Sequence, residues 1–306
     1  MRDVVIIGGG LSGLAAAWEL TKLNIPYTLI EVKRRFGGAI ISESREGFVM
    51  DGGPLFVSRH EDWSCLTELG LQGALIPVDD KRAVFRHGTQ TLTDALANKL
   101  STPAMKRMAV SSLGKINEQV FGVCLENGIL LDARALIIAA PARYAEKMLR
   151  ELQGDIALRL LNLRYDSIIR LSLGYRRHDV PNFTAPAESS VTYIETLTNG
   201  TRMPADCVLI QAGMRFEVSK GKPQDPIAAF TARMGWQAPL VARADYWPEA
   251  DLLRDAEYTA YLAQIPTLLP AGTALIGSDY LPNDSLRARM AQGRAAAQQI
   301  AAYLAR

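Results

Sequence analysis

The chain begins with a predicted strand, three glycines and a predicted helix, and this segment constrains the fold more than any other. Four β-branched residues, Val4 to Ile7, precede the glycines, and the Ala- and Leu-rich segment 11–17 follows them. A continuous apolar run of this kind is typical of a strand covered on both faces of a parallel sheet. Gly8, Gly10 and Gly13 have the G-x-G-x-x-G spacing after a strand and at the start of a helix, the context that gives this motif its meaning.

The glycine spacing predicts a dinucleotide site. The first glycine permits a sharp turn, the second lets the backbone approach a pyrophosphate, and the third lets the helix pack closely on the strand. The positive end of that helix, at Leu11 and Ser12, attracts phosphate. A second strand over 27–30 ends in Glu31, whose carboxylate can accept hydrogen bonds from ribose and would repel a 2′-phosphate. A glycine-rich turn in an ordinary α/β domain is the alternative, but the complete set of elements favours an adenine dinucleotide.

A second series of glycines follows the acid: Gly37-Gly38 and then Asp51-Gly52-Gly53-Pro54. A simple NAD domain has no need of this addition. With it, the chain resembles the FAD-dependent amine oxidase, protoporphyrinogen oxidase and phytoene desaturase superfamily, and the resemblance implies FAD. None of the three cysteines lies in the final Gly-x-Asp segment, where amine oxidases have their attachment cysteine, so we expect FAD to be bound non-covalently. Ala39 stands where the family usually has Arg or Lys. Lys33, Arg34 and Arg35 are near enough in sequence to supply the positive charge.

Later segments extend the resemblance. Alternating apolar residues around Asn127-Gly128 predict a β-hairpin, and in the family a three-stranded meander here covers the adenine. The strand over 135–140 ends in a small Ala-Pro pair, and a Trp247-Pro248 segment precedes the strand that ends in Gly277-Ser278-Asp279. The family binds FAD hydroxyls or phosphate with this last acid, and the final helix points its N-terminus at the flavin.

The cofactor contacts that the motifs and the resemblance imply come from all of these segments. They are Gly8, Gly10, Leu11, Ser12, Gly13, Glu31, Val32, Lys33, Arg34, Gly37, Gly38, Ala39, Gly52, Gly53, Pro54, Leu113, Ala140, Pro141, Trp247, Gly277, Asp279, Ser285 and Leu286. Trp247 and Tyr280 are also candidates to face the substrate, as an aromatic pair beside the flavin. Both residue types are more often packing residues, and no other catalytic side chain is expected.

The expected fold class is α/β, with a Rossmann-type FAD-binding domain interleaved with a smaller α+β substrate domain. The FAD-binding domain comprises residues 1–56, 88–145 and 268–306, and the substrate domain comprises 57–87 and 146–267. Within the latter, strands are expected over 168–174, 191–194 and 207–213, a helix over 226–233, and a loop at 181–186. Only about thirty residues separate Pro54 from the helix after Gly88. The larger relatives have a much longer insert there, so the substrate domain is shortened.

Composition excludes several classes of protein. The net charge of +2 with mixed signs gives no reason to expect nucleic acid, and no apolar run is long enough to span a membrane. Three scattered cysteines form neither a metal motif nor a disulfide framework. The first strand begins so close to Met1 that no leader is expected. We therefore expect a soluble, cytoplasmic protein without metal, and a homodimer remains open.

We expect an FAD-dependent oxidoreductase that removes hydride from a small or planar organic substrate and passes electrons to O₂ or another acceptor. The flavin performs such chemistry itself, which explains why no acid–base constellation is visible. The resemblance is nearest to protoporphyrinogen oxidases, then to renalase-like NAD(P)H oxidoreductases and amine oxidases. A flavin-binding protein without turnover is a further alternative.

Overall fold

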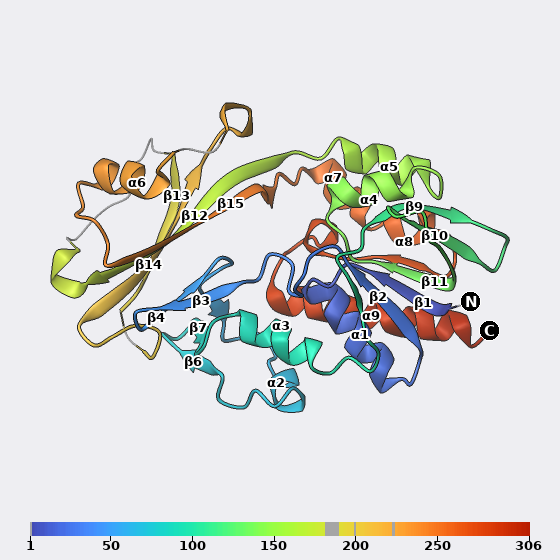
Figure 1. The fold of residues 1–306 in the computed structure, drawn as a ribbon, viewed down its shortest axis with the longest axis horizontal. Coiled ribbons are helices and arrows are strands. Elements are labelled where there is room, and N and C mark those ends of the chain that lie inside the picture. Colours follow the sequence, from blue (N-terminus) through green and yellow to red (C-terminus); the bar gives the residue numbers. More distant parts are fainter. Residues whose placement is uncertain (1, 181–189, 199, 222–223) are drawn as a thin grey trace. The chain divides into compact units, whose positions relative to one another are not determined.

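The computed structural model describes residues 2–180, 190–198, 200–221 and 224–306. They form two compact units (Figure 1). Unit 1 contains Met1–Gly38, Leu92–Leu163 and Arg254–Arg306, and unit 2 contains Ala39–Thr91 and Arg164–Leu253. Residues 39–56, which we assign to the FAD-binding domain, therefore pack within unit 2, and 146–163 and 254–267 pack within unit 1. The compact units are defined by contacts within the chain, whereas the predicted domains are defined by the ligand that they bind. The division into an FAD-binding domain and a substrate domain therefore remains a prediction.

Unit 1 is built on a seven-stranded sheet whose centre is parallel. In spatial order the main path is β8 (Met105–Lys106), β2 (Tyr27–Glu31), β1 (Arg2–Ile7), β11 (Leu130–Ile138), β10 (Phe121–Leu125) and β9 (Val110–Lys115), while β16 (Thr273–Leu275) pairs with β11. The inner residues of β1 are fully buried, as the β-branched run predicts. The predicted meander is present, because β9, β10 and β11 are successive antiparallel neighbours.

One strand serves both the meander and the parallel sheet. The sequence suggests two strands, at 129–131 and 135–140, but β11 is continuous from Leu130 to Ile138. Its first residues pair antiparallel with β10, and from Ala133 onward it pairs parallel with β1. Residues 132–134 continue the strand with alternating burial. The meander is therefore an extension of the central sheet.

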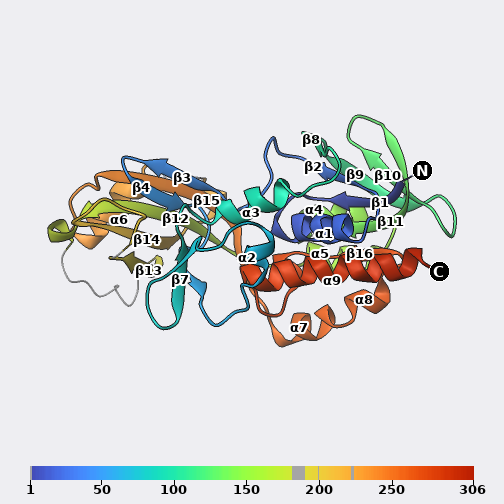
Figure 2. The ribbon, with the colours of Figure 1, turned by 90° about the horizontal axis from the view of Figure 1, so that it is seen from below.

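Two helices from opposite ends of the chain pack together in unit 1. Helix α1 (Leu11–Lys22) follows β1, and α9 (Leu286–Leu304) is the last element; Figure 2 shows them side by side. A Cβ added to Gly293 of α9 would lie 2.2 Å from the carbonyl oxygen of Ser12. The unit also contains α4 (Ala142–Leu149), α5 (Gly154–Leu161), η3 (Ser278–Tyr280), α7 (Ala256–Leu262) and α8 (Ile265–Leu268), and the chain enters it through α3 (Gln90–Ala97).

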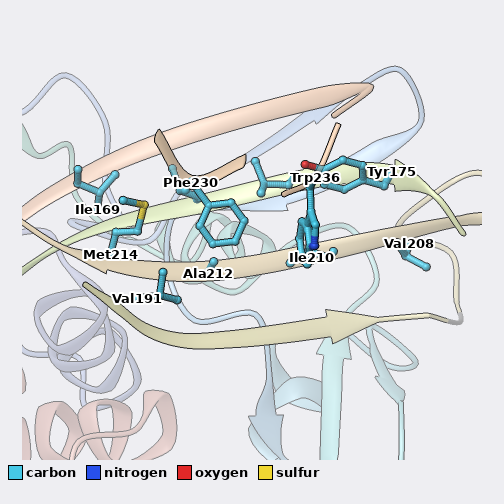
Figure 3. Close-up of a cluster of buried hydrophobic side chains, with 11 residues drawn as sticks. Ile169, Tyr175, Val191, Val208, Ile210, Ala212, Met214, Phe230 and Trp236 are labelled. Carbon is cyan, nitrogen blue, oxygen red and sulfur yellow. The ribbon is translucent and has the colours of Figure 1, made fainter. Parts of the chain in front are cut away.

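Unit 2 is organised around a four-stranded antiparallel sheet. Its order is β13 (Val191–Leu197), β14 (Cys207–Arg215), β12 (Tyr165–Arg176) and β15 (Val241–Leu252). One face carries Ile169, Leu171 and Leu173 of β12 with Ile210 and Ala212 of β14, and Phe230 and Trp236 cover it (Figure 3). Phe230 belongs to helix α6 (Pro226–Met234), in agreement with the predicted helix. The three predicted strands are present, and β15 is a further strand that contains Trp247.

Smaller elements complete unit 2. They are β3 (Ser42–Arg45) with β4 (Phe48–Asp51), β5 (Val57–Ser58) with β7 (Arg82–Phe85) and β6 (Leu75–Pro77), the helix α2 (Cys65–Glu68), and the 3₁₀ turns η1 (Arg177–Asp179) and η2 (Val218–Lys220). The predicted loop at 181–186 lies outside the described residues. Among the residues described, no helix combines the length and apolar character required to cross a membrane.

Candidate functional site

The glycine turn between β1 and α1 is packed against backbone. Gly8 has φ +106°, and a Cβ there would lie 2.5 Å from the carbonyl oxygen of Ala139 in the segment after β11. A Cβ on Gly13 would lie 1.9 Å from the carbonyl oxygen of Gly8. Both contacts are shorter than any real side chain allows, so the helix can approach the sheet only if these residues are glycines.

The N-terminus of α1 is open beside Gly10. This residue caps the helix without a side-chain hydrogen bond, and the first turn contains no acidic residue. A Cβ built on Gly10 meets no atom within 4 Å, whereas one on Gly38, at φ +60°, would lie 3.3 Å from Gly10 Cα. The first N–H groups of a helix have no partner within it. This end of the helix therefore has the N–H donors that a phosphate requires, and a pyrophosphate at this position remains a prediction.

The Glu31 side chain links the loop after β1 to the loop after β2 by hydrogen bonds. One carboxylate oxygen accepts the backbone N–H of Gly9 and the other accepts that of Lys33, each at 2.7 Å, and the side chain is buried. Each oxygen can accept a further hydrogen bond, because a carboxylate offers about four acceptor positions. The predicted bond to ribose is therefore compatible with the contacts present, and it remains a prediction.

Basic residues surround the second glycine pair. Lys33 Nζ and Arg35 Nη2 donate to the carbonyl oxygen of Gly38 at 3.4 and 2.9 Å. Lys106 Nζ lies 4.1 Å from the centre of the Phe36 ring. Arg34 and Val32 are exposed. Positive charge is thus present in the loop that precedes Ala39, and its contact with a cofactor remains a prediction.

The Gly277–Tyr280 loop is tied to the end of β11. Asp279 Oδ2 accepts the N–H of Ala142, the first residue of α4, at 2.8 Å. The Tyr258 hydroxyl donates to the carbonyl oxygen of Asp279 at 3.0 Å, and that of Tyr280 donates to Ala140. Burial, followed by the charge of Asp279, raises the pKa of Tyr258, so its hydroxyl keeps the proton that it donates.

Several predicted contact residues of unit 1 therefore lie together. Ala140, Pro141, Asp279 and Tyr280 are neighbours, and Pro141 is the residue that caps α4. Tyr280 is buried with its hydroxyl bound to backbone, which corresponds to the packing role that the sequence left open. Ser285 caps α9 by accepting the N–H of Ala288 at 3.0 Å, and Leu286 begins the helix. Leu113 is fully buried in β9.

In unit 2 the Asp51-Gly52-Gly53-Pro54 turn is held by side chains from three strands of the sheet. Ser172 and Gln211 donate to the carbonyl oxygen of Asp51 at 3.1 and 3.2 Å, and Gln211 also donates to that of Gly53 at 2.9 Å. The carbonyl oxygen of Gly52 accepts from Arg170 Nη1 at 3.1 Å and from Trp247 Nε1 at 3.0 Å. Three consecutive carbonyl groups are thus bound. The candidate Trp247 contacts the turn through its indole N–H.

The carboxylate of Asp51 is surrounded by hydrogen-bond donors. It accepts from the hydroxyl of Ser42 at 2.5 Å, from the N–H and hydroxyl of Thr89 at 3.0 Å each, and from Arg202 Nη2 at 2.7 Å. Both side chains of the Asp51–Arg202 ion pair are fully buried. Within the described residues, Nε and Nη1 of Arg202 have no hydrogen-bond partner.

Sequence reasoning missed the residues that hold this turn: Arg170, Ser172, Arg202 and Gln211. A signal exists in β12, where Arg170 and Ser172 alternate with Ile169, Leu171 and Leu173 and so lie on the polar face. Which turn that face would bind is not encoded locally. Among the described residues there is also no group of three or more His, Cys, Asp or Glu side chains placed to hold a metal ion.

Comparisons with known proteins agree with this arrangement. Residues 6–69 match the family model of the NAD(P)-binding Rossmann-like domain. The chain is 35% identical over 83 residues to the coproporphyrinogen III oxidase of Propionibacterium freudenreichii, which is 26% of this chain and 16% of that protein. It is 28% identical over 150 residues, 48% of this chain and 30% of the relative, to a Mycobacterium tuberculosis protein assigned as a flavin-containing monoamine oxidase.

The fold similarity extends further than the sequence similarity, since these two sequence matches span less than a third of the relatives' own length. A crystal structure of a protein from Exiguobacterium, assigned as a protoporphyrinogen oxidase, superimposes with a TM-score of 0.81 at 12% identity. The superposition covers 100% of this chain and 99% of that one. Flavin is accordingly the cofactor type that the relatives indicate. The chain thus has the fold of solved structures that include a protein assigned as a protoporphyrinogen oxidase and amine oxidases, and its residues 6–69 match the NAD(P)-binding Rossmann-like domain.

Proposed function

We propose that the chain is an FAD-dependent oxidoreductase of the protoporphyrinogen oxidase-like type. It removes hydride from a small or planar organic substrate, and the electrons pass to O₂ or another acceptor. The observation that carries the proposal is the N-terminus of α1, where no atom lies within 4 Å of a Cβ built on Gly10. Gly38 lies beside it, and Lys33 and Arg35 donate to the Gly38 carbonyl oxygen. Acidic side chains are absent from the first turn of α1, so a diphosphate meets no repulsion there.

Bound FAD supplies the two-electron chemistry, and the residues of this chain bind and orient it. In unit 1, Glu31 holds the loops after β1 and β2, and the Gly8 and Gly13 contacts fix the start of α1. In unit 2, Arg170 and Trp247 fix the carbonyl of Gly52. FAD is held without a covalent bond, since none of the three cysteines lies in the segment 272–286, where the family's attachment cysteine is expected.

A second candidate is amine oxidation. The match to the assigned monoamine oxidase covers 48% of this chain, more than the 26% covered by the coproporphyrinogen oxidase match. The two candidates share the cofactor and the direction of electron transfer. They differ in the class of substrate.

The experiment that tests the function is an anaerobic reduction screen of the purified holoprotein. Porphyrinogens, amines and reduced nicotinamides are added separately, and the visible flavin band is followed. Bleaching by one class identifies an oxidoreductase and its substrate class. A flavin that is reduced by dithionite but by none of these compounds would contradict the proposed turnover and favour a flavin-binding protein without activity of its own.

A further inference from the structure

Unit 1 contains a cavity that none of the predicted cofactor contacts lines. Its volume is about 190 Å³, and it is bordered by the segment of α7 and α8, by β16 and by α9, which Figure 2 shows on one side of the unit. The lining residues are Leu262, Ile265, Pro266, Leu269, Thr273, Ala274, Leu275, Ile276, Tyr280, Gln292, Ala295, Ala296 and Gln299.

Small side chains of α9 leave the space open. Ala295 and Ala296 contribute only a methyl group each to the lining, whereas α8 and β16 contribute larger aliphatic side chains such as Ile265 and Leu275. Ile265 and Leu275 are buried, and Ala295 is exposed. A residue with more side-chain atoms at position 295 would therefore occupy part of this space.

The polar groups inside the cavity already have partners. The Thr273 hydroxyl donates to the carbonyl oxygen of Pro270, and the Tyr280 hydroxyl to that of Ala140. Gln292 accepts the N–H of Gly277 at 2.8 Å and donates to the carbonyl oxygen of Tyr280 at 3.2 Å. The lining contains no charged residue. A charged ligand would therefore lose its hydration without gaining a partner, which disfavours its binding.

One lining residue can still form hydrogen bonds. Gln299 is exposed, as are Pro266 and Ala295, so these three residues mark the solvent side of the cavity. Within the described residues the Gln299 amide makes no hydrogen bond. A carboxamide has both an acceptor oxygen and N–H donors, so it can pair with one hydroxyl or N–H group of a ligand.

We propose that this cavity binds a small neutral molecule with one aromatic ring and one hydroxyl or N–H group. The ring occupies the aliphatic interior, and the polar group pairs with Gln299. An apolar cavity of about 150 Å³ accommodates benzene, so the present volume has room for a single substituted ring. Displacement of poorly bonded water by the ring favours binding. The inference does not depend on the proposed function.

A ligand-observed NMR titration of the flavin-containing protein tests the proposal with three single-ring probes. Phenol has a ring and a hydroxyl group, toluene has no hydrogen-bonding group, and benzoate is charged. A hydrogen bond between neutral groups changes affinity by about two- to tenfold. We expect phenol to bind more tightly than toluene by this factor, and more tightly than benzoate by about tenfold or more.

Ala295→Phe tests the position of the ligand. Helical side chains lean toward the N-terminus of their helix, so the new ring would reach the part of the cavity lined by Gln292. This variant should bind neither phenol nor toluene. Ala291→Phe is the matched control, because Ala291 is also exposed on α9 and does not line the cavity, and its ring would lean away from it. It should bind both probes as the parent protein does.

Gln299→Leu tests the polar contact. It should lower the affinity for phenol to that for toluene and leave the affinity for toluene unchanged, because the aliphatic interior is retained. Gln264→Leu is its control, since Gln264 is exposed in the same unit and does not line the cavity. Both affinities should stay unchanged in that variant. If Ala295→Phe fails to fold, the Gln299→Leu result still decides whether phenol occupies this cavity.

Phenol binding that persists in Ala295→Phe, or a benzoate affinity equal to that of phenol, would overturn the inference. Flavin content is measured on every sample. A protein that binds phenol as expected but takes up no flavin would contradict the proposed function and leave this site standing. A flavin-containing protein that binds no phenol would contradict this inference alone.

Discussion

The two glycine turns of this chain are stabilised in different ways. The Gly8–Gly13 turn of unit 1 is set by close backbone packing, since Gly13 packs on the Gly8 carbonyl and Gly8 on the Ala139 carbonyl, and Glu31 accepts the Gly9 N–H. The Asp51–Gly53 turn of unit 2 is held by Arg170, Gln211 and Trp247, which are 118 to 195 positions away from the carbonyl groups that they bind. The first turn depends mainly on close backbone packing, and the second on hydrogen bonds from side chains that are distant in sequence.

The largest expected effect of a substitution is at Asp51. Asp51→Ala leaves the fully buried Arg202 without its carboxylate and removes the acceptor of Ser42 and Thr89. Removing one partner of a buried ion pair costs about 3–5 kcal/mol. Chemical denaturation should therefore show a loss of this size. Glu217→Gln, in an exposed pair with Lys220, is the control and should change stability little. A small loss in the free energy of unfolding for Asp51→Ala would show that the hydrogen bonds to its carboxylate do not support the turn.

Gly13→Ala tests the close packing of the first turn. The new Cβ would lie 1.9 Å from the Gly8 carbonyl oxygen, so the backbone must move, at a cost of about 1–3 kcal/mol. Gly10→Ala is the matched control, because nothing lies within 4 Å of its Cβ. It should leave the free energy of unfolding unchanged and lower the flavin content. If Gly13→Ala and Gly10→Ala lower the free energy of unfolding by the same amount, the two glycines do not have separate roles.

Glu31→Ala should weaken flavin retention. It removes the acceptor of the Gly9 and Lys33 N–H groups and the proposed bonds to ribose, each charge-assisted bond being worth about 1.5–3 kcal/mol. We expect the FAD dissociation constant, measured by fluorescence titration of apoprotein, to rise by about tenfold or more. Leu158→Ala, at an exposed position of unit 1 outside the predicted cofactor contacts, serves as control. A mutant that purifies with full flavin content would refute the ribose assignment.

The smallest expected effect is a pH dependence where α1 meets α9. Burial raises the pKa of Glu19, but hydrogen bonds from Gln298 and Arg294 outweigh burial and leave that pKa below its ordinary value. A lowered pKa contributes stability above the ordinary value of 4.5, and this is lost as pH falls through the folded-state pKa. Arg294→Gln should lower stability at pH 7 by about 1 kcal/mol and flatten the decline below pH 4.5. An unchanged dependence of stability on pH in Arg294→Gln would show that the Glu19–Arg294 pair does not contribute to stability.

The comparison of the two turns also explains how much the sequence could predict. The strand, glycines, helix and Glu31 lie within the first 31 residues, and local spacing was enough to predict them and the parallel sheet. Strands β12, β13 and β14 were likewise predicted from their apolar residues. The continuity of β11 was missed, because residues 132–134 carry two charges that resemble a turn when read alone.

The contacts of the second turn could not be predicted because they depend on strand register. Arg170, Ser172 and Gln211 are ordinary polar residues in sequence, and only the β12–β14 pairing aligns Ser172 with Gln211 on one face. Arg202 lies outside the helices and strands, and nothing local indicates that it is fully buried beside Asp51. Side chains that act at long sequence separation require the folded structure to be identified.

The central claim is that this chain holds FAD without a covalent bond, and acid precipitation of the purified yellow protein tests it most directly. Flavin is quantified in the supernatant and in the pellet. The account predicts one FAD per chain, all of it released into the supernatant. Colour that stays in the pellet would contradict non-covalent binding, and a colourless protein that takes up no added FAD would contradict the flavin assignment itself.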